Sequence, residues 1–367
     1  MKYKKTTLFA AALLGAAPAI AQQAGSNVTL FGLIDQGVER VWGVNLGNGQ
    51  RGSEDRIGAG TIASRWGLRA SEDLGGGLKA IFTLESGISL DTGVQGQGRL
   101  FGRQAFVGLS GSFGTVTLGR QYAMRYYALF DADIFGAGAQ GLGSIDPGIP
   151  NARVDNTIAW RGEAGPISGG MNYSLGRDTV NTNNPTGTNC PGESSDSKAC
   201  REWSAMIKYD GGQWGVVSAY ERQHGGSAAT YGGLTSPDKT DDRFTLNAYI
   251  KMDQTRYGIG WLKRTNEGSV TPTSDLYWIA SALPVGPVVL IDGMVAQLKY
   301  RDSPNKVLLL TLRANYALSK RTALYLGAAN VDNSGTLAIG ASTNAPATAP
   351  LPGGSQLSII TGIRHAF

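Results

Sequence analysis

Long apolar runs are missing from this sequence of 367 residues, and that absence removes one class of membrane protein. A transmembrane helix needs roughly 20 consecutive apolar residues, and no segment beyond the N-terminal region offers even about 18. Charged residues are also scarce at 17%, below the roughly 25% of ordinary soluble domains. The composition therefore fits neither a helical membrane protein nor a typical soluble domain.

Histidine and cysteine are rare too, with two residues of each. His224 and His365 stand far from each other and from the cysteines, so no cluster has the spacing of a metal site. No Gly-x-Ser-x-Gly motif and no other pairing of a nucleophile with a general base accompanies them. We therefore expect neither an enzyme nor a bound metal or cofactor.

The N-terminus has the features of an export signal. Three of the first five residues are lysines, Leu8–Leu14 is apolar, and Ala19-Ile20-Ala21 has the small-x-small pattern of a cleavage site. We expect residues 1–21 to be a signal peptide and residues 22–367 to form the mature chain. Cleavage lowers the formal net charge from +5 to +2, which leaves no basic footprint for nucleic acid.

The two cysteines, Cys190 and Cys200, lie close together in a segment rich in Asn, Thr, Ser and Gly. In an exported chain such a pair favours a disulfide. Closing a loop this short stabilises a protein by roughly 2–3 kcal/mol. Two free thiols are the alternative, and a metal site is disfavoured because no third ligand stands beside the pair.

Alternation of apolar and polar residues is the main pattern in the rest of the chain. Leu308, Leu310 and Leu312 point to one face of an extended segment, while Thr311 and Arg313 point to the other. A soluble sheet buries its apolar face as a core, whereas a barrel in a bilayer turns that face outward and encloses water. Two segments, Gly102–Leu109 and Val288–Ala296, are apolar on both faces, which suits a strand covered by a neighbour or a loop.

Sixteen strand-like runs are recognisable, and most are separated by Gly, Pro, Asn or Asp. They are Val28–Trp42, Thr61–Ala70, Leu78–Ile88, Gly102–Leu109, Thr115–Gln121, Arg153–Gly162, Ile167–Gly176, Trp203–Tyr209, Trp214–Glu221, Arg243–Met252, Arg256–Lys263, Asp275–Leu283, Val288–Arg301, Val307–Leu318, Thr322–Val331 and Gln356–Phe367.

The links between these runs alternate in length. Short turns follow the even runs, and the longest links, such as 122–152 and 333–355, follow odd ones. This asymmetry is typical of outer-membrane barrels, in which an open sheet edge is too costly and the first strand must pair with the last. We therefore expect an all-β fold, a 16-stranded antiparallel transmembrane β-barrel with a polar lumen. Tryptophans and tyrosines near the strand ends, Tyr325 among them, are expected to form girdles at the headgroups.

Several motifs stand out along the chain. They are Thr29-Leu30-Phe31-Gly32-Leu33-Ile34-Asp35, Ser64-Arg65-Trp66-Gly67-Leu68-Arg69, Gly102-Arg103-Gln104-Ala105-Phe106-Val107-Gly108-Leu109, Gly114-Thr115-Val116-Thr117-Leu118-Gly119-Arg120-Gln121-Tyr122, Leu318-Ser319-Lys320-Arg321-Thr322 and the terminal Phe367. These motifs resemble those of the trimeric general porins of Gram-negative outer membranes, most closely those of beta-proteobacteria. The resemblance covers the whole mature chain and implies an outer-membrane homotrimer that contacts lipid and lets small polar solutes diffuse passively.

The resemblance also implies a third long loop that folds into the barrel and narrows it. Residues 122–152 are in the right place for this constriction loop. Its aromatic side chains, Tyr126, Tyr127, Phe130 and Phe135, are expected to anchor it to the inner wall. The wall bases that match the family pattern are Arg65, Arg69, Arg103 and Arg153. The alternative is that each arginine is an ordinary solvated residue of the lumen.

The loop departs from the family pattern at its tip. Many members carry Pro-Glu-Phe-Gly there, whereas this chain has Asp133-Ile134-Phe135-Gly136, so the usual glutamate is replaced by Ile134. Asp131 and Asp133 are the candidate substitutes, and Asp146 is a weaker one. Because rings of arginine favour anions, four arginines facing one or two acids predict weak anion selectivity for small polar or anionic solutes. A non-selective or cation-preferring pore is the alternative.

Overall fold

The computed structural model describes residues 27–136, 138–180, 188–193, 195–226, 233–344 and 348–367. The expected signal peptide, residues 1–21, lies outside the described residues. No helix in the described ranges is long and apolar enough to cross a membrane.

Strands make up most of the described chain. In chain order the elements are β1 (Asn27–Asn45), β2 (Arg51–Ala59), β3 (Arg65–Gly75), β4 (Leu78–Gly87), a short 3-10 turn (Gly96–Gly98), β5 (Gln104–Gly111), β6 (Gly114–Tyr122), α1 (Met124–Leu129), α2 (Leu142–Ile145), β7 (Arg153–Val154), β8 (Thr157–Ala164), β9 (Ile167–Ser174), β10 (Arg177–Val180), β11 (Thr188–Cys190), β12 (Glu202–Asp210), β13 (Trp214–His224), β14 (Thr240–Met252), β15 (Thr255–Asn266), β16 (Thr273–Val285), β17 (Val289–Tyr300), β18 (Lys306–Ala317), β19 (Thr322–Ser334) and β20 (Ser355–Ala366).

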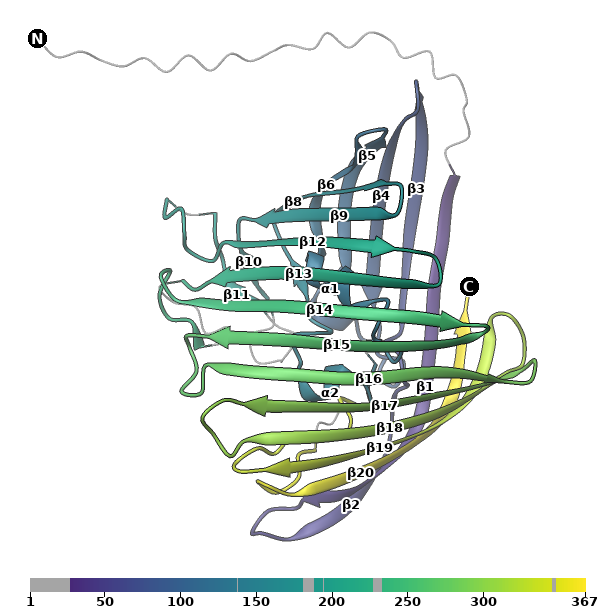
Figure 1. Ribbon diagram of the computed structural model, residues 1–367, viewed down its shortest axis with the longest axis vertical. Helices are drawn as coiled ribbons and strands as arrows, with labels where there is room; N and C mark the ends of the chain where they lie inside the picture. The colour runs from purple at the N-terminus through teal and green to yellow at the C-terminus, as the bar shows by residue number, and fades with distance from the viewer. Residues whose placement is uncertain (1–26, 137, 181–187, 194, 227–232, 345–347) are drawn as a thin grey trace, which may run out of the picture.

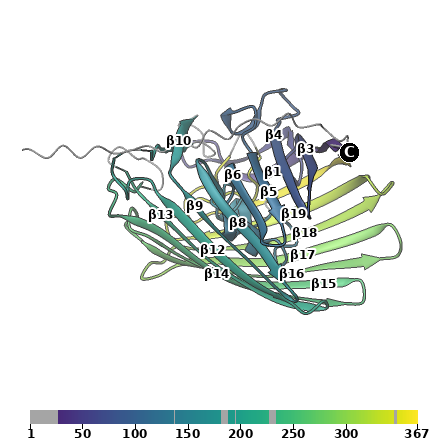
Figure 2. The same ribbon diagram turned by 90° about the horizontal axis from the view of Figure 1, so that it is seen from above.

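These strands form one closed antiparallel barrel, as Figures 1 and 2 show. β1 pairs with β20 from Leu33 opposite Ala366 to Trp42 opposite Leu357, so the first strand closes the sheet against the last. β2 and β3 pair with successive parts of β1, and β7 and β8 both pair with β6. Each of these two pairs is one interrupted wall strand, which gives the sixteen strands expected from the sequence. β10 and β11 form a separate hairpin in a loop.

The second wall strand differs from its expected range. It begins at Arg51 rather than Thr61 and is broken between β2 and β3. At the break the chain turns to the carboxylate of Asp35 on β1, which accepts bonds from the Thr61 hydroxyl (3.1 Å) and the Ile62 N–H (2.9 Å). A side-chain carboxylate therefore replaces strand pairing at this point of the wall.

The two faces of the wall differ as a membrane barrel requires. On β18, Leu308, Leu310 and Leu312 are between 43% and 58% exposed on the outside. The alternate residues Thr311 and Arg313 are 2% and 6% exposed on the inside. The apolar residues are thus not sealed in a core, and the outer face suits hydrocarbon while the inner face suits water.

Aromatic side chains project from the outer face near the strand ends, as expected for girdles. Examples are Trp203, Tyr209, Trp214, Tyr257 and Tyr316, each between 38% and 50% exposed. The expectation for one further tyrosine was wrong. Tyr325 points inward, is 3% exposed, and donates its hydroxyl to Asp35 at 2.6 Å.

One patch of the lumen wall is apolar, so the expected polar lining is wrong there. The inward side chains of β15–β18 pack against side chains of the segment between β6 and β7, which displaces water from both. The wall contributes Leu262, Leu276, Trp278, Met294 and Leu309, and the segment contributes Leu129, Phe135, Leu142, Ile145 and Ile149. The expectation that a loop covers a strand with two apolar faces is confirmed for β17, whose Met294 and Ala296 lie in this cluster.

Candidate functional site

The segment between β6 and β7 folds back into the barrel and carries α1 and α2, which lie behind the front strands in Figure 1. Its two ends are joined at the wall by a bond from the Ala123 N–H to the Ala152 carbonyl (3.0 Å). We call residues 123–152 the inner loop. Apolar side chains at intervals along it, from Leu129 to Ile149, explain why it stays in the lumen rather than above it.

Inward-facing wall residues on several strands bind the inner loop. The Asn247 amide on β14 donates to the Ala128 carbonyl (3.0 Å). On the other side of the lumen, the Gln140 amide donates to the Ser358 hydroxyl on β20 (2.7 Å), and the Thr311 hydroxyl on β18 donates to the Gln140 carbonyl (2.9 Å). The inner loop therefore reaches from β14 to β20 across the interior and narrows the space left for water.

An ion pair that the sequence analysis did not identify also holds the inner loop. Arg125 on α1 is 2% exposed and donates to both oxygens of Glu221 on β13, at 3.2 and 3.3 Å. The same guanidinium donates to the Gly148 carbonyl at 3.1 Å, which ties two parts of the loop together. Glu221 is 1% exposed, so the pair is shielded from lumen water. The alternation of β13 predicts that Glu221 faces inward, but it does not predict which loop residue pairs with Glu221.

The aromatic side chains expected to anchor the loop behave differently from one another. Phe135 lies in the apolar cluster, as expected. Tyr126 stacks on Tyr122 at the end of β6 with ring centroids 3.7 Å apart, and Tyr127 meets the same ring edge-on at 6.3 Å. The expectation for Phe130 was wrong, because its side chain is 68% exposed and anchors nothing.

Three of the four expected wall arginines come together around one carboxylate and one tyrosine. Arg103 donates to Glu85 at 2.6 Å and to the Tyr122 hydroxyl at 2.8 Å. Arg65 lies 3.3 Å from the same carboxylate, and Arg153 donates to the same hydroxyl at 3.0 Å. We call these three residues the arginine cluster. Arg65 begins β3, Arg103 immediately precedes β5 and Arg153 lies on β7, and of the three, Arg65 and Arg103 pair with Glu85.

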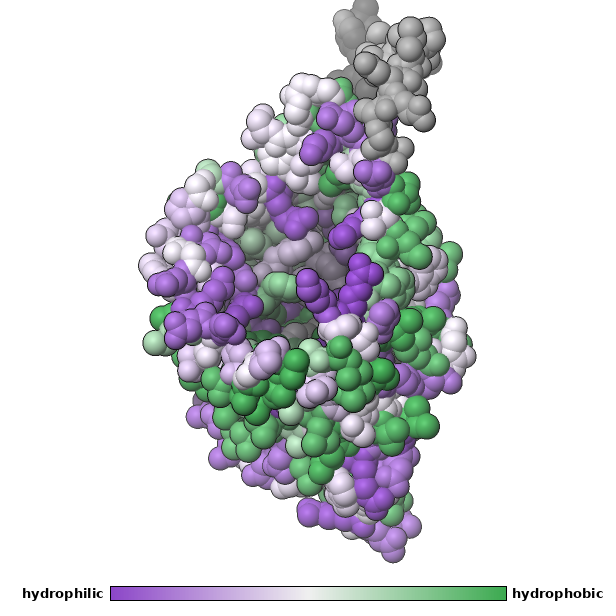
Figure 3. All heavy atoms as spheres, turned by 90° about the vertical axis from the view of Figure 1, so that its right-hand side faces the viewer, coloured by the Kyte–Doolittle hydropathy of each residue, from purple (hydrophilic) through white to green (hydrophobic). Residues whose placement is uncertain are grey.

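The fourth arginine, Arg69, does not join this cluster. Arg69 lies four residues after Arg65 on β3 and is therefore nearer the turn between β3 and β4. Its side chain is exposed, and its guanidinium lies 5.2 Å from the ring centre of Phe31. It is a lumen residue near the end of the barrel where the short turns lie. Figure 3 looks onto that end, which is hollowed and surrounded by hydrophilic side chains.

The two expected loop acids have other partners. Asp131 lies 2.6 Å from the Lys208 ammonium on β12 and also pairs with Arg256 on β15 at 3.4 Å. Asp133 is 7% exposed and accepts a bond from the Gly136 N–H at 3.1 Å. Burial raises the pKa of Asp133 to about 7, although the Gly136 and Phe135 N–H groups oppose the rise. No ion pair in the described ranges joins either acid to the arginine cluster.

The weaker candidate, Asp146, is buried near another part of the wall. Its carboxylate lies 3.7 Å from Arg243 and accepts the Gly148 N–H at 2.8 Å. Burial alone would raise its pKa, but the charges of Arg243, Arg264 and Arg125 outweigh that effect and hold the pKa below its ordinary value. Asp146 therefore serves to fix the loop to the wall.

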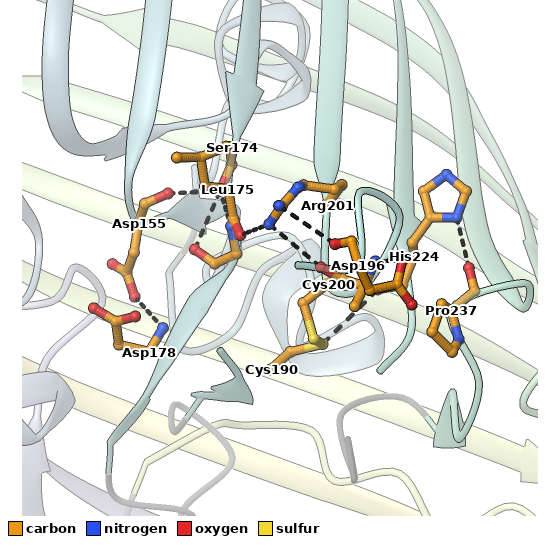
Figure 4. Close-up of a disulfide and its surroundings, with 12 residues drawn as sticks. Asp155, Ser174, Leu175, Asp178, Cys190, Asp196, Cys200, Arg201, His224 and Pro237 are labelled. Carbon is orange, nitrogen blue, oxygen red and sulfur yellow. Dashed lines mark hydrogen bonds between the residues drawn. A yellow bond between two sulfur atoms is a disulfide. The ribbon is translucent and has the colours of Figure 1, made fainter. Parts of the chain in front are cut away.

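The structure joins Cys190 and Cys200 in a disulfide in the link between β9 and β12, at the end with the long loops (Figure 4). Next to it, the Cys200 N–H donates to the Gly225 carbonyl (2.9 Å) and the His224 N–H to the Arg201 carbonyl (2.8 Å). The bridge therefore closes the link between β9 and β12, and the backbone bonds beside it tie this link to the start of the next outer loop. Within the described ranges, no group of three or more His, Cys, Asp and Glu side chains is placed to hold a metal ion.

Comparisons with known proteins agree with this geometry. Residues 7–336 match the family described as Gram-negative porin. Outer membrane porin protein 32 of Delftia acidovorans is 32% identical over 99% of this chain and 100% of its own length. An outer membrane porin protein of Bordetella pertussis is 28% identical over the same shares of the two chains.

Solved structures show the same fold. The anion-selective porin from Comamonas acidovorans superposes with a TM-score of 0.75 at 28% identity, covering 94% of this chain and 100% of its own. The trimer form of OmpT from Vibrio cholerae, at 15% identity and a TM-score of 0.64 over 94% and 100%, supports the fold alone. The chain therefore belongs to the Gram-negative porins, the passive channels of the outer membrane.

Proposed function

We propose that this porin passes small polar solutes through a constriction made by the inner loop, and that it prefers anions weakly. The observation that carries the proposal is the arginine cluster: Glu85 pairs with Arg65 and Arg103, while Arg153 donates to the neutral Tyr122 hydroxyl, so the cations outnumber the acid. At physiological salt the screening length is about 8 Å, so wall charges act across a narrow pore. Rings of arginine select anions in such pores.

The positions of the loop acids support the same sign of selectivity. Asp131 pairs with Lys208 and Arg256, which cancel its negative charge. Asp133 is buried, and its raised pKa keeps part of the population neutral near pH 7. Neither acid offsets the arginine cluster. A relative at 28% identity is described as an anion-selective porin, which agrees with this interpretation.

Single-channel conductance in different salts tests the proposal. Replacing chloride with the larger acetate should lower the conductance of the purified porin strongly, whereas replacing potassium with lithium should change it little. Equal sensitivity to both exchanges would identify a non-selective pore, and a stronger response to the cation would identify the cation-preferring alternative. Lack of any conductance would contradict the channel itself.

We propose further that three copies assemble in the membrane. The outer face presents apolar residues along β1 as well as β18, for example Val38 at 55% exposed, which suits contact with either lipid or another subunit. The same fold occurs in a solved trimer form of OmpT. Conductance that appears in groups of three equal steps would support the trimer. Single steps, together with a particle mass in detergent that equals one chain, would contradict it.

Export and cleavage are also part of the proposal. N-terminal sequencing of protein isolated from outer membranes should begin at Gln22, immediately after Ala21. A mature chain that retains Lys2, Lys4 and Lys5 would contradict the expected signal peptide.

A further inference from the structure

A cavity of about 340 Å³ lies between the inner loop and the wall, and Tyr126, which stacks on Tyr122, separates it from the arginine cluster. Its wall side is formed by residues near the short turns, among them Leu290, Arg313 and Arg364. Its loop side is formed by Phe130, Ile134 and other residues of the loop tip. This volume falls within the range of roughly 300–1,000 Å³ that is common for small-molecule sites.

One side of the cavity is apolar and uncovered. Phe130 is 68% exposed, although it lies in the interior of the barrel rather than on its lipid face. Ile134 of the loop and Leu290 of the wall also line the cavity. When an apolar ligand covers large apolar side chains that are in contact with lumen water, the burial of their surface favours binding.

Three arginines line the cavity, and they are occupied to different degrees. Arg256 pairs with Asp131 of the loop at 3.4 Å. Arg313 donates to Asp292 at 2.9 and 2.7 Å and lies over the Phe135 ring, 4.6 Å from its centre. Its charge is therefore neutralised and its position is fixed. The planar guanidinium of Arg313 therefore lines the cavity beside its apolar side chains.

Arg364 on β20 is the cation left for a ligand. Its Nη2 donates to the Asn315 side-chain oxygen at 3.3 Å, and its Nη1 has no hydrogen-bond partner among the described residues. The acid nearest along the inner face, Asp35, already accepts bonds from Tyr325, Thr61 and Ile62. A buried donor without an acceptor is costly and favours an anionic ligand.

We propose that this cavity is a binding site for monocarboxylates with an apolar, preferably aromatic, body. The carboxylate accepts two bonds from the Arg364 guanidinium, a geometry that suits planar recognition. The body covers Phe130 and Ile134. The inference rests on the proposed function, since the ligand reaches the cavity through an open channel.

Current blockade in planar bilayers tests the inference, with the full chain and three probes. Benzoate carries both the charge and the ring, acetate carries the charge alone, and benzyl alcohol carries the ring alone. Benzoate should interrupt the chloride current at concentrations about tenfold below the other two, because each of them loses one of the two contacts. Equal blockade by benzoate and acetate, with normal conductance, would contradict the site and leave the channel standing. A protein without conductance would overturn both.

Two variants assign the contacts. Arg364→Gln should weaken blockade by benzoate about tenfold while leaving that by benzyl alcohol unchanged. Phe130→Ala should weaken blockade by both compounds, and because Phe130 is exposed, its removal leaves the packing of the loop intact. Phe130→Ala thus keeps the inference testable if the Arg364 variant fails to assemble.

Arg321→Gln is the matched control. Arg321 is an exposed arginine in the turn between β18 and β19, at the same end of the barrel but outside the cavity. Its replacement removes the same charge and should leave benzoate blockade as in the unaltered protein. A loss equal to that of Arg364→Gln would show a general effect of charge at this end of the barrel and would contradict the site.

Discussion

Arg65 differs from the other members of the arginine cluster in how far lumen water reaches it. Its side chain is 29% exposed, compared with 8% for Arg103. Both share Glu85, which lies at 5% exposure between them. The charge of Arg65 is therefore the one that a passing ion meets most directly, while Arg103 and Glu85 hold the cluster in shape.

Replacing Arg65 with glutamine should lower the chloride-over-potassium permeability ratio by about twofold. A unit charge about 8 Å away in water is worth about 0.5 kcal/mol, which screening over that distance lowers to about 0.2 kcal/mol. Because this energy has opposite signs for chloride and potassium, the ratio changes by about that twofold factor. Zero-current potentials of the variant and the unaltered protein in the same salt gradient measure the change. Arg69→Gln serves as the control, since Arg69 lies outside the cluster and its loss should change the ratio less. A larger effect of Arg69→Gln would locate the selective region at the short-turn end.

The stability of the inner loop should depend on pH through the carboxyl group of Asp133. Burial raises its folded-state pKa to about 7, above the ordinary value near 4, so folding favours the neutral carboxyl. The stabilisation of the loop is therefore complete below about pH 4 and is lost as the pH rises through about 7. Hydrogen exchange of residues 124–136 should accordingly be faster at pH 9 than at pH 5.

Asp133→Asn isolates this effect from the ordinary pH dependence of exchange. After correction for intrinsic exchange rates, the variant should protect the loop equally at both pH values, because an amide does not titrate. Protection in the unaltered protein that increases from pH 5 to pH 9 would show that the folded-state pKa is lowered instead.

At the scale of elements, the inner loop depends on its ion pair with the wall. Arg125→Met keeps most of the side-chain volume but leaves Glu221 buried without its cation, which in general costs about 3–5 kcal/mol. We expect more frequent closures and a noisier open current in single-channel recordings. Combining Arg125→Met with Glu221→Gln should make closures less frequent and the open current less noisy than in Arg125→Met alone, because no unpaired charge is then buried. Recordings indistinguishable from the unaltered protein would show that the apolar cluster holds the loop by itself.

The disulfide belongs to a different element, the link between β9 and β12. Replacing Cys190 and Cys200 by serine should make that link easier to cleave by an added protease, since the bridge restricts the open conformations by roughly 3 kcal/mol. Conductance should change little, because the exchange of cysteine for serine alters no charge. Altered ion selectivity in the double variant would place the outer loop in the conduction path.

The elements that the sequence predicts well are those with a lipid-facing side. β18 alternates leucine with polar residues, and its range is close to the expected one. β2 was missed because its outward residues Arg51, Ser53 and Asp55 are polar, and Asp55 pairs with Arg40 of β1 at 2.9 Å. A hairpin with polar residues on both faces extends beyond the hydrocarbon, so hydrophobic alternation cannot reveal it.

The same reasoning explains which parts of the site were predictable. Arg65 and Arg153 sit on wall strands and Arg103 immediately precedes β5, so a motif and a register place them together. The partners of Asp131 and Arg125 depend on the path of an inner loop that has no period. Lys208 and Glu221 were visible as inward residues of their strands, but nothing in the sequence connected them to the loop.

At the scale of the whole molecule, closure of β1 on β20 turns an open sheet into a hollow wall, which no isolated strand can provide. The inner loop then borders both the arginine cluster, through Tyr126 stacked on Tyr122, and the cavity near the short turns. Figure 3 shows that the short-turn end of the barrel is hollowed. Solutes that cross the barrel meet guanidinium groups in both.

The zero-current potential of the purified porin across a bilayer with a tenfold gradient of potassium chloride is the most direct measurement. A water-filled barrel with three arginines around one acid should give a potential whose sign shows chloride crossing faster than potassium. A potential of the opposite sign would contradict the cationic constriction, and a bilayer that stays non-conducting would contradict the open barrel.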